Sequence, residues 1–138
     1  MKFIHVVRDG RDMAFSANQN QLRKHGAAVL GRELEDTPQP VRAAALWARV
    51  NEEAASYGEL RMTGRYLLVT FERLCSHTRE TVQQIFDFLE SDPARLDAAV
   101  KEIAPPSSIG RWRHNTDEGL LSAIQAHAGD ALRRFGFV

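Results

Sequence analysis

A short apolar run near the start of the chain constrains its fold most. Residues 3–7 read Phe-Ile-His-Val-Val and are followed by Arg8 and an Asp-Gly pair. Such a run, rich in β-branched residues, predicts a strand buried on both faces and a sharp turn into a helix over about residues 11–24. Arg8 would end the strand, and Ser16 would lie on the second turn of the helix. We expect their side chains and the free helix N–H groups to converge on one phosphate, although plain turn chemistry is the alternative.

A second apolar run, over residues 66–71, is also short enough to be a strand. Pro40 suits the first turn of a helix that keeps an apolar face until Gly58 stops it. A helical connection of this kind is what a parallel pair of strands requires, so both strands are predicted to share one parallel sheet. The stretch before this helix is predicted to be a surface connection because it carries turn-forming residues: Gly26, Gly31, Pro38 and Pro40.

The second half of the chain has the pattern of helices. Apolar residues repeat at helical spacing from Thr78 to Leu89, and Asp92 and Pro93 predict the start of another helix that runs to about Ile103. An ordered loop over residues 107–113 should lead to the last helix. This helix would begin at a capping box of Asn115 and Glu118 and end at Gly136. The fold class is therefore α/β, a mainly helical chain with about two parallel strands.

Composition narrows the kinds of partner. The 138 residues predict one domain, and the 18 basic and 18 acidic residues cancel, which excludes a broad nucleic-acid or membrane-binding face. Cys75 is the only cysteine, so no internal disulfide can form, and no apolar segment has the length of a membrane span. A soluble protein of a reducing compartment, the cytoplasm, is the expectation, with Cys75 as a small buried residue and not a reactive thiol.

Several segments together resemble the sulfotransferase family, which uses 3′-phosphoadenosine 5′-phosphosulfate as its sulfuryl donor. The segment over residues 7–12 with Ser16 is similar to the part of that family that binds the 3′-phosphate. The family also has a helix with a tryptophan, a strand that ends in an aromatic residue and Glu, and a helix that ends in Phe-Leu. Its tail carries a basic residue before Trp and a last helix that ends in Gly-aromatic. The similar elements here are Trp47 and residues 70–74, 85–89, 110–113 and 135–137.

The resemblance implies a fold and a set of ligand contacts. The chain would be the C-terminal part of a P-loop-like sulfotransferase fold, and Arg8 and Ser16 would hold the 3′-phosphate of 3′-phosphoadenosine 5′-phosphosulfate or of the product, 3′,5′-bisphosphoadenosine. Arg111 would reach the same phosphate from the C-terminal loop, although a solvated loop arginine is the alternative reading. A guanidinium and a hydroxyl suit the acceptor oxygens of a phosphate. The implied reaction is transfer of a sulfuryl group to a hydroxyl or amine acceptor.

One element of the family is missing from the sequence. The Ser/Gly/Thr-rich loop that binds the 5′-phosphosulfate precedes the 3′-phosphate segment, and here only Met1 and Lys2 precede the first strand. The resemblance therefore assigns no catalytic residue, and we expect little turnover from this chain alone. Alternatives are a non-catalytic remnant that binds the nucleotide and a helical interaction domain. Strands without neighbours would leave exposed sheet edges, which favour homo-oligomers.

The other polar residues favour structural roles. Glu72 is expected to cap a turn or to pair with Arg73 or Arg8 rather than act as a base. His5 is expected to be a satisfied core histidine, and no spacing of His and Cys indicates a metal site. The remaining structural assignments are Asp9 and Asp12 in the turn and first helical turn, Trp47 with Asn51 in packing, and Trp112 as a core anchor.

Overall fold

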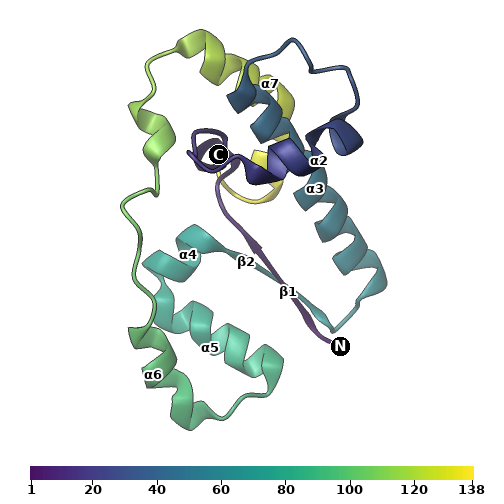
Figure 1. The fold of residues 1–138 in the computed structure, drawn as a ribbon. Helices are drawn as coiled ribbons and strands as arrows, with labels where there is room; N and C mark the ends of the chain where they lie inside the picture. Colours follow the sequence, from purple (N-terminus) through teal and green to yellow (C-terminus); the bar gives the residue numbers. More distant parts are fainter. The chain divides into compact units, whose positions relative to one another are not determined.

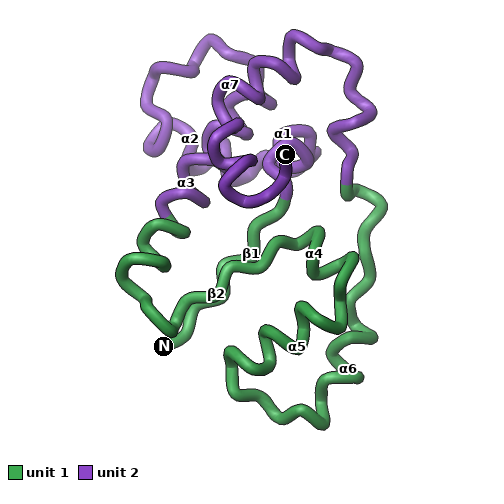
Figure 2. Tube along the Cα trace, turned by 180° about the vertical axis from the view of Figure 1, so that it is seen from behind, with its two compact units in different colours: residues 1–8, 54–109 green, residues 9–53, 110–138 purple.

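A computed structural model describes all residues from Met1 to Val138. Helices make up 63% of the chain, and the one sheet has two parallel strands, so the predicted α/β class is confirmed. Figure 1 shows the elements along the chain. The chain forms two compact units, coloured in Figure 2: unit 1 holds residues 1–8 and 54–109, and unit 2 holds residues 9–53 and 110–138.

The sheet lies in unit 1. Strand β1 (Phe3–Val7) pairs with β2 (Tyr66–Thr70), and the register joins Phe3 to Tyr66 and Val7 to Thr70, as the parallel prediction required. The prediction that the first strand is buried on both faces is wrong. Val7 is 1% exposed, but Val6, which points to the opposite face, is 51% exposed. No further strand lies beyond β1 to help cover Val6, because β1 pairs with β2 alone.

Three helices and a 3₁₀ turn follow the sheet in unit 1. These are α4 (Phe71–Ser76), α5 (Thr78–Leu89), the 3₁₀ turn η1 (Pro93–Arg95) and α6 (Leu96–Lys101). The Asp92 carboxylate accepts a hydrogen bond from the Ala94 N–H, so the predicted cap is confirmed. Because that cap begins a short 3₁₀ turn, the α-helix itself begins only at Leu96.

Unit 2 begins with two short helices where one was predicted. Helix α1 (Gly10–Ala14) stops after five residues, and a connection of five residues separates it from α2 (Asn20–Leu30). The Gln19 side-chain amide donates to the carbonyls of Met13 and Ser16 at 3.1 and 2.7 Å, which satisfies backbone groups that a continuous helix would have bonded itself. Ser16 is therefore in the connection and not on a second helical turn. The predicted surface connection is also partly wrong, because Gly26 lies inside α2.

Helix α3 (Gln39–Arg61) contributes residues to both units and does not stop at Gly58. A Cβ atom at Gly58 would lie 2.2 Å from the Tyr66 ring, so this glycine makes room for an aromatic side chain and does not end the helix. Gly10 has the same use in unit 2, where a Cβ would lie 2.3 Å from the Trp47 ring. Pro40 is in the first turn of α3, as predicted.

The last helix completes the core of unit 2. The 3₁₀ turn η2 (Arg111–His114) precedes α7 (Glu118–Arg134), and the Trp47 ring packs 5.9 Å from that of Phe135. The predicted capping box is wrong: Asp117 is the N-cap, and its carboxylate accepts from the Leu120 N–H. Gly136 ends the helix as predicted, at a positive φ of 77°. No helix has the length and apolar character needed to cross a membrane.

Candidate functional site

Arg8 directly follows β1 in unit 1 and has a fixed orientation. Its Nη2 donates to the carbonyl oxygen of Ser108 at 2.7 Å and to the Ser108 hydroxyl at 2.9 Å. The guanidinium carbon lies 5.4 Å from the centre of the Phe71 ring, within the range of a cation–π contact. A half-buried arginine held on two sides loses little further side-chain entropy when it binds an anion.

Ser16 lies in unit 2, in the connection between α1 and α2. Its hydroxyl oxygen accepts from the Asn18 N–H at 3.3 Å, and its own N–H donates to the Met13 carbonyl at 3.2 Å. Its carbonyl oxygen accepts from the Gln19 amide at 2.7 Å. The hydroxyl proton is thus not used by these bonds, so the side chain can donate to an anion while the connection stays in place.

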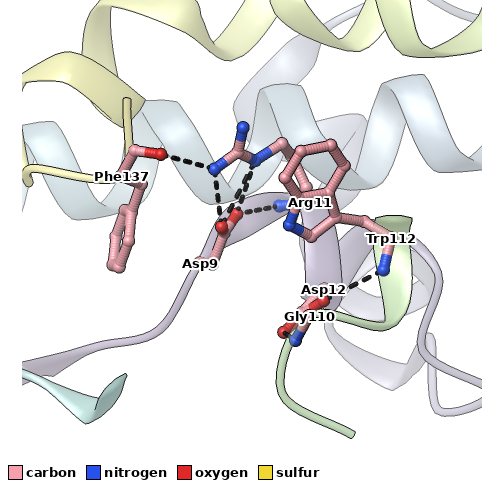
Figure 3. Close-up of polar contacts among 6 residues, drawn as sticks. All are labelled: Asp9, Arg11, Asp12, Gly110, Trp112 and Phe137. Atoms are coloured by element: carbon pink, nitrogen blue, oxygen red, sulfur yellow. Dashed lines mark hydrogen bonds and ion pairs between the residues drawn. The ribbon is translucent and has the colours of Figure 1, made fainter. Parts of the chain in front are cut away.

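Arg111 is the first residue of η2, and its two neighbours are held by one carboxylate. Asp12 Oδ2 accepts from the Gly110 N–H at 2.7 Å, and Asp12 Oδ1 accepts from the Trp112 N–H at 3.2 Å, as Figure 3 shows. Asp12 is 1% exposed, so both bonds are shielded from water. This carboxylate places the backbone of Arg111 against α1, a role beyond that of the first-turn carboxylate expected from the sequence.

A buried ion pair supports the same part of unit 2. The Arg11 guanidinium donates to the Asp9 carboxylate at 2.7 Å and to the Phe137 carbonyl at 2.6 Å. It also stacks on Trp112, 3.9 Å from the ring centre, and Figure 3 shows these groups together. Asp9 is the N-cap of α1 and accepts from the Arg11 N–H. The turn role of Asp9 was predicted from the sequence, but the role of Arg11 was not, because Phe137 and Trp112 are far from Arg11 in the chain.

The predicted site residues are thus placed in two units. Arg8 belongs to unit 1, whereas Ser16 and Arg111 belong to unit 2. Within each unit the same two stretches of sequence are bonded, because Arg8 contacts Ser108 in unit 1 and Asp12 contacts Gly110 in unit 2. Residues 8–12 and 108–112, about a hundred positions apart, are therefore paired segments.

The groups around Arg8 affect the nearby thiol. Burial raises the pKa of the Cys75 thiol, the negative charge of Glu72 raises the pKa further, and the positive charge of Arg8 lowers it. A raised pKa disfavours the thiolate, which is the nucleophilic form, so Cys75 does not have the character of a catalytic thiol. Arg73, one of the partners expected for Glu72, lies 3.9 Å from Glu80.

Two of the structural assignments are confirmed. His5 is buried, and its Nδ1 lies 2.8 Å from the Tyr66 hydroxyl, so it is a satisfied core histidine. The Asn51 amide donates to the Trp47 carbonyl at 2.7 Å, so the expected satisfied amide is present. Trp112, which was predicted to be a core anchor, is only half-buried, and Arg11 and Arg113 contact its ring.

The comparisons with known proteins identify a family. No curated protein and no solved structure matches the sequence. A family model described as the sulfotransferase domain matches residues 1–135, nearly the whole chain. This match agrees with the ordered segments of the sequence, from the Arg8 turn to the last helix, and on this ground the chain belongs to the sulfotransferase domain family.

Proposed function

We propose that this chain binds the 3′-phosphate end of 3′-phosphoadenosine 5′-phosphosulfate or of its product, 3′,5′-bisphosphoadenosine. Arg8, Ser16 and Arg111 are the proposed contacts. The observation that carries the proposal is the pair of hydrogen bonds by which buried Asp12 holds the two neighbours of Arg111. An arginine on an anchored loop can be aimed at a ligand at a lower cost in entropy than one on a free loop.

The chemistry of these groups supports the same ligand. A phosphate offers strong acceptor oxygens, and arginine matches them with several N–H donors in a planar arrangement. The contacts of Arg8 with Ser108 and Phe71 orient its guanidinium before any ligand binds. The Ser16 hydroxyl adds a donor in unit 2. The connection between α1 and α2 that carries Ser16 is held by the Gln19 amide.

The proposed reaction is that of the family, transfer of a sulfuryl group. The sulfuryl group leaves the 5′-phosphate oxygen of the donor for the oxygen or nitrogen of a hydroxyl or amine acceptor. The acceptor loses a proton, and 3′,5′-bisphosphoadenosine departs. We assign no residue of 1–138 to the transfer step and propose that the 5′-phosphosulfate is bound by residues other than these. The single cysteine suits a reducing compartment, so we propose the cytoplasm as the location.

Calorimetric titration with 3′,5′-bisphosphoadenosine tests the proposal. The unaltered chain should bind it, and Arg8→Ala, Ser16→Ala and Arg111→Ala should each weaken binding by roughly tenfold or more, because hydrogen bonds to charged groups contribute about 1.5–3 kcal/mol. Arg113→Ala is the matched control, because Arg113 is an exposed arginine in the same 3₁₀ turn as Arg111, and it should bind as the unaltered chain does.

Circular dichroism of each variant separates loss of a contact from loss of the fold. If a variant keeps its helical signal and binds the nucleotide as tightly as the unaltered chain, the replaced residue is not a contact and its assignment is refuted. No heat of binding by the folded, unaltered chain at millimolar nucleotide would refute the proposal as a whole and favour an interaction domain.

A further inference from the structure

A cavity of about 360 Å³ lies in unit 2, along one face of α2. Residues of α2 at helical spacing line it, together with the first turns of α3 and the connection between the two helices. Its apolar wall includes Leu22, Leu30 and Leu34. Cavities of about 300–1,000 Å³ are the usual size for small-molecule sites. None of Arg8, Ser16 and Arg111 lines this cavity, so it is separate from the proposed nucleotide contacts.

Arg42 of α3 lines the cavity, and one of its donors is unused. Its Nε is buried and has no hydrogen-bond acceptor in the chain. No carboxylate lies within ion-pair distance of its guanidinium. Buried polar groups in proteins are nearly always hydrogen-bonded, because an unsatisfied one costs free energy, and a charged one costs more. An acceptor from outside the chain would remove that cost.

The charges that face the cavity favour an anion. Arg23 and Arg42 line it, opposed by the one carboxylate of Glu35, which leaves an excess of one positive charge. Arg23 donates to the Asn20 side chain on its own helix. Arg42 also lies in the second turn of α3, whose first turn has no acidic residue, so the positive end of the helix dipole is not neutralised there.

We propose that this cavity binds a small organic anion, with a carboxylate, sulfate or sulfonate group on Arg42 and Arg23 and an apolar body against the leucines. The apolar wall explains why a body larger than an inorganic ion fits, and the unsatisfied Nε explains why the ligand is charged. This inference goes beyond the proposed nucleotide site and does not rest on it.

Fluorescence titration with 8-anilinonaphthalene-1-sulfonate tests the proposal on the full chain. This probe carries one sulfonate on an apolar ring system, and N-phenyl-1-naphthylamine is the same ring system without the charge. The sulfonate should bind the unaltered chain roughly tenfold or more tightly than the neutral compound does. Arg42→Met should remove that advantage. Arg42→Lys, which keeps the charge but lacks Nε, should retain part of it.

The control is Arg61→Met, at an exposed arginine near the end of the same helix, which should leave the affinity for the sulfonate unchanged. Arg42→Met should also melt at the temperature of the unaltered chain or above it, because it removes an unsatisfied buried donor. Equal affinity for the charged and neutral probes, or an unchanged affinity in a folded Arg42→Met variant, would overturn the proposal. Titration of Arg42→Met with 3′,5′-bisphosphoadenosine keeps the two sites distinguishable, because that binding should be unaffected.

Discussion

At the scale of single residues, Arg11 has the most consequential contacts in unit 2. Its guanidinium joins the Asp9 carboxylate, the Phe137 carbonyl and the Trp112 ring, which come from both ends of the chain. Arg11→Ala would leave the buried Asp9 carboxylate without this partner. We expect it to lower the free energy of unfolding by about 3–5 kcal/mol, the usual effect of removing one member of a buried pair. Urea unfolding followed by circular dichroism measures this difference.

The exposed pair of Arg79 and Asp97, at 2.7 Å, is the control. Both side chains are exposed to water, so Arg79→Ala should lower the free energy of unfolding by less than about 1 kcal/mol. If the two substitutions had equal effects, Arg11 would not hold unit 2 together as the contacts indicate.

The Cys75 thiol gives a pH-dependent signal from the surroundings of Arg8. Its pKa is raised by burial and then by Glu72, so less of it is thiolate at pH 8 than in an unfolded chain. Reaction with a disulfide reagent at pH 8 should therefore be slower in the folded chain. Glu72→Gln removes a charge that raises the pKa and should speed the reaction, whereas Arg8→Gln removes one that lowers it and should slow the reaction. Rates that shift in the opposite directions would contradict this placement.

The same shift affects stability. A thiol whose pKa is raised on folding binds its proton more tightly in the folded state. Its contribution to stability is therefore complete below the unfolded pKa and is lost as the pH rises through the folded pKa.

At the scale of elements, two glycines in helices have opposite uses. A Cβ at Gly58 of α3 would lie 2.2 Å from the Tyr66 ring, so Gly58→Ala must displace an aromatic side chain that contacts His5. We expect a loss of about 1–3 kcal/mol, the usual effect of overpacking. Gly119→Ala in the first turn of α7 meets only the Asp117 carboxylate, at 3.4 Å, and should be neutral or stabilising by up to about 1 kcal/mol. Thermal unfolding of both variants measures the contrast, and similar melting temperatures would contradict it.

Local patterns in the sequence predicted the elements whose ends depend on neighbouring residues. Both strands, their parallel pairing, helix α5 and the Gly136 stop were predictable because apolar runs, helical spacing and turn residues are local signals. The break before Ser16 was not, because the Gln19 side chain that replaces helical bonds resembles any polar residue in a helix. The length of α3 was missed because a glycine that accommodates a ring looks like one that ends a helix.

The candidate site shows the same division. Arg8, Ser16 and Arg111 were found by residue type and by order along the chain, whereas the anchoring roles of Asp12 and Arg11 were missed. Asp12 and Gly110 are 98 positions apart, and no local pattern records a bond over that separation. The exposure of Val6 was missed for a related reason, because the number of strands in a sheet is a property of the whole fold.

At the scale of the whole molecule, Arg8 and Arg111 come from two segments that are far apart in the chain. Residues 8–12 and 108–112 are bonded in each unit, by Arg8 in unit 1 and by Asp12 in unit 2. The family model of the sulfotransferase domain matches residues 1–135, which include both segments. The central proposal is that Arg8 and Arg111 of these segments, together with Ser16, recognise the 3′-phosphate of the nucleotide.

A comparison of two nucleotides tests this claim most directly. Isothermal titration of the chain with 3′,5′-bisphosphoadenosine and with adenosine 5′-monophosphate isolates the 3′-phosphate, which only the first compound carries. The bisphosphate should bind roughly tenfold or more tightly, and Ser16→Ala should reduce that ratio. Equal affinities of the unaltered chain for the two nucleotides would contradict the proposal. So would an affinity ratio that stays unchanged in all three variants, Arg8→Ala, Ser16→Ala and Arg111→Ala.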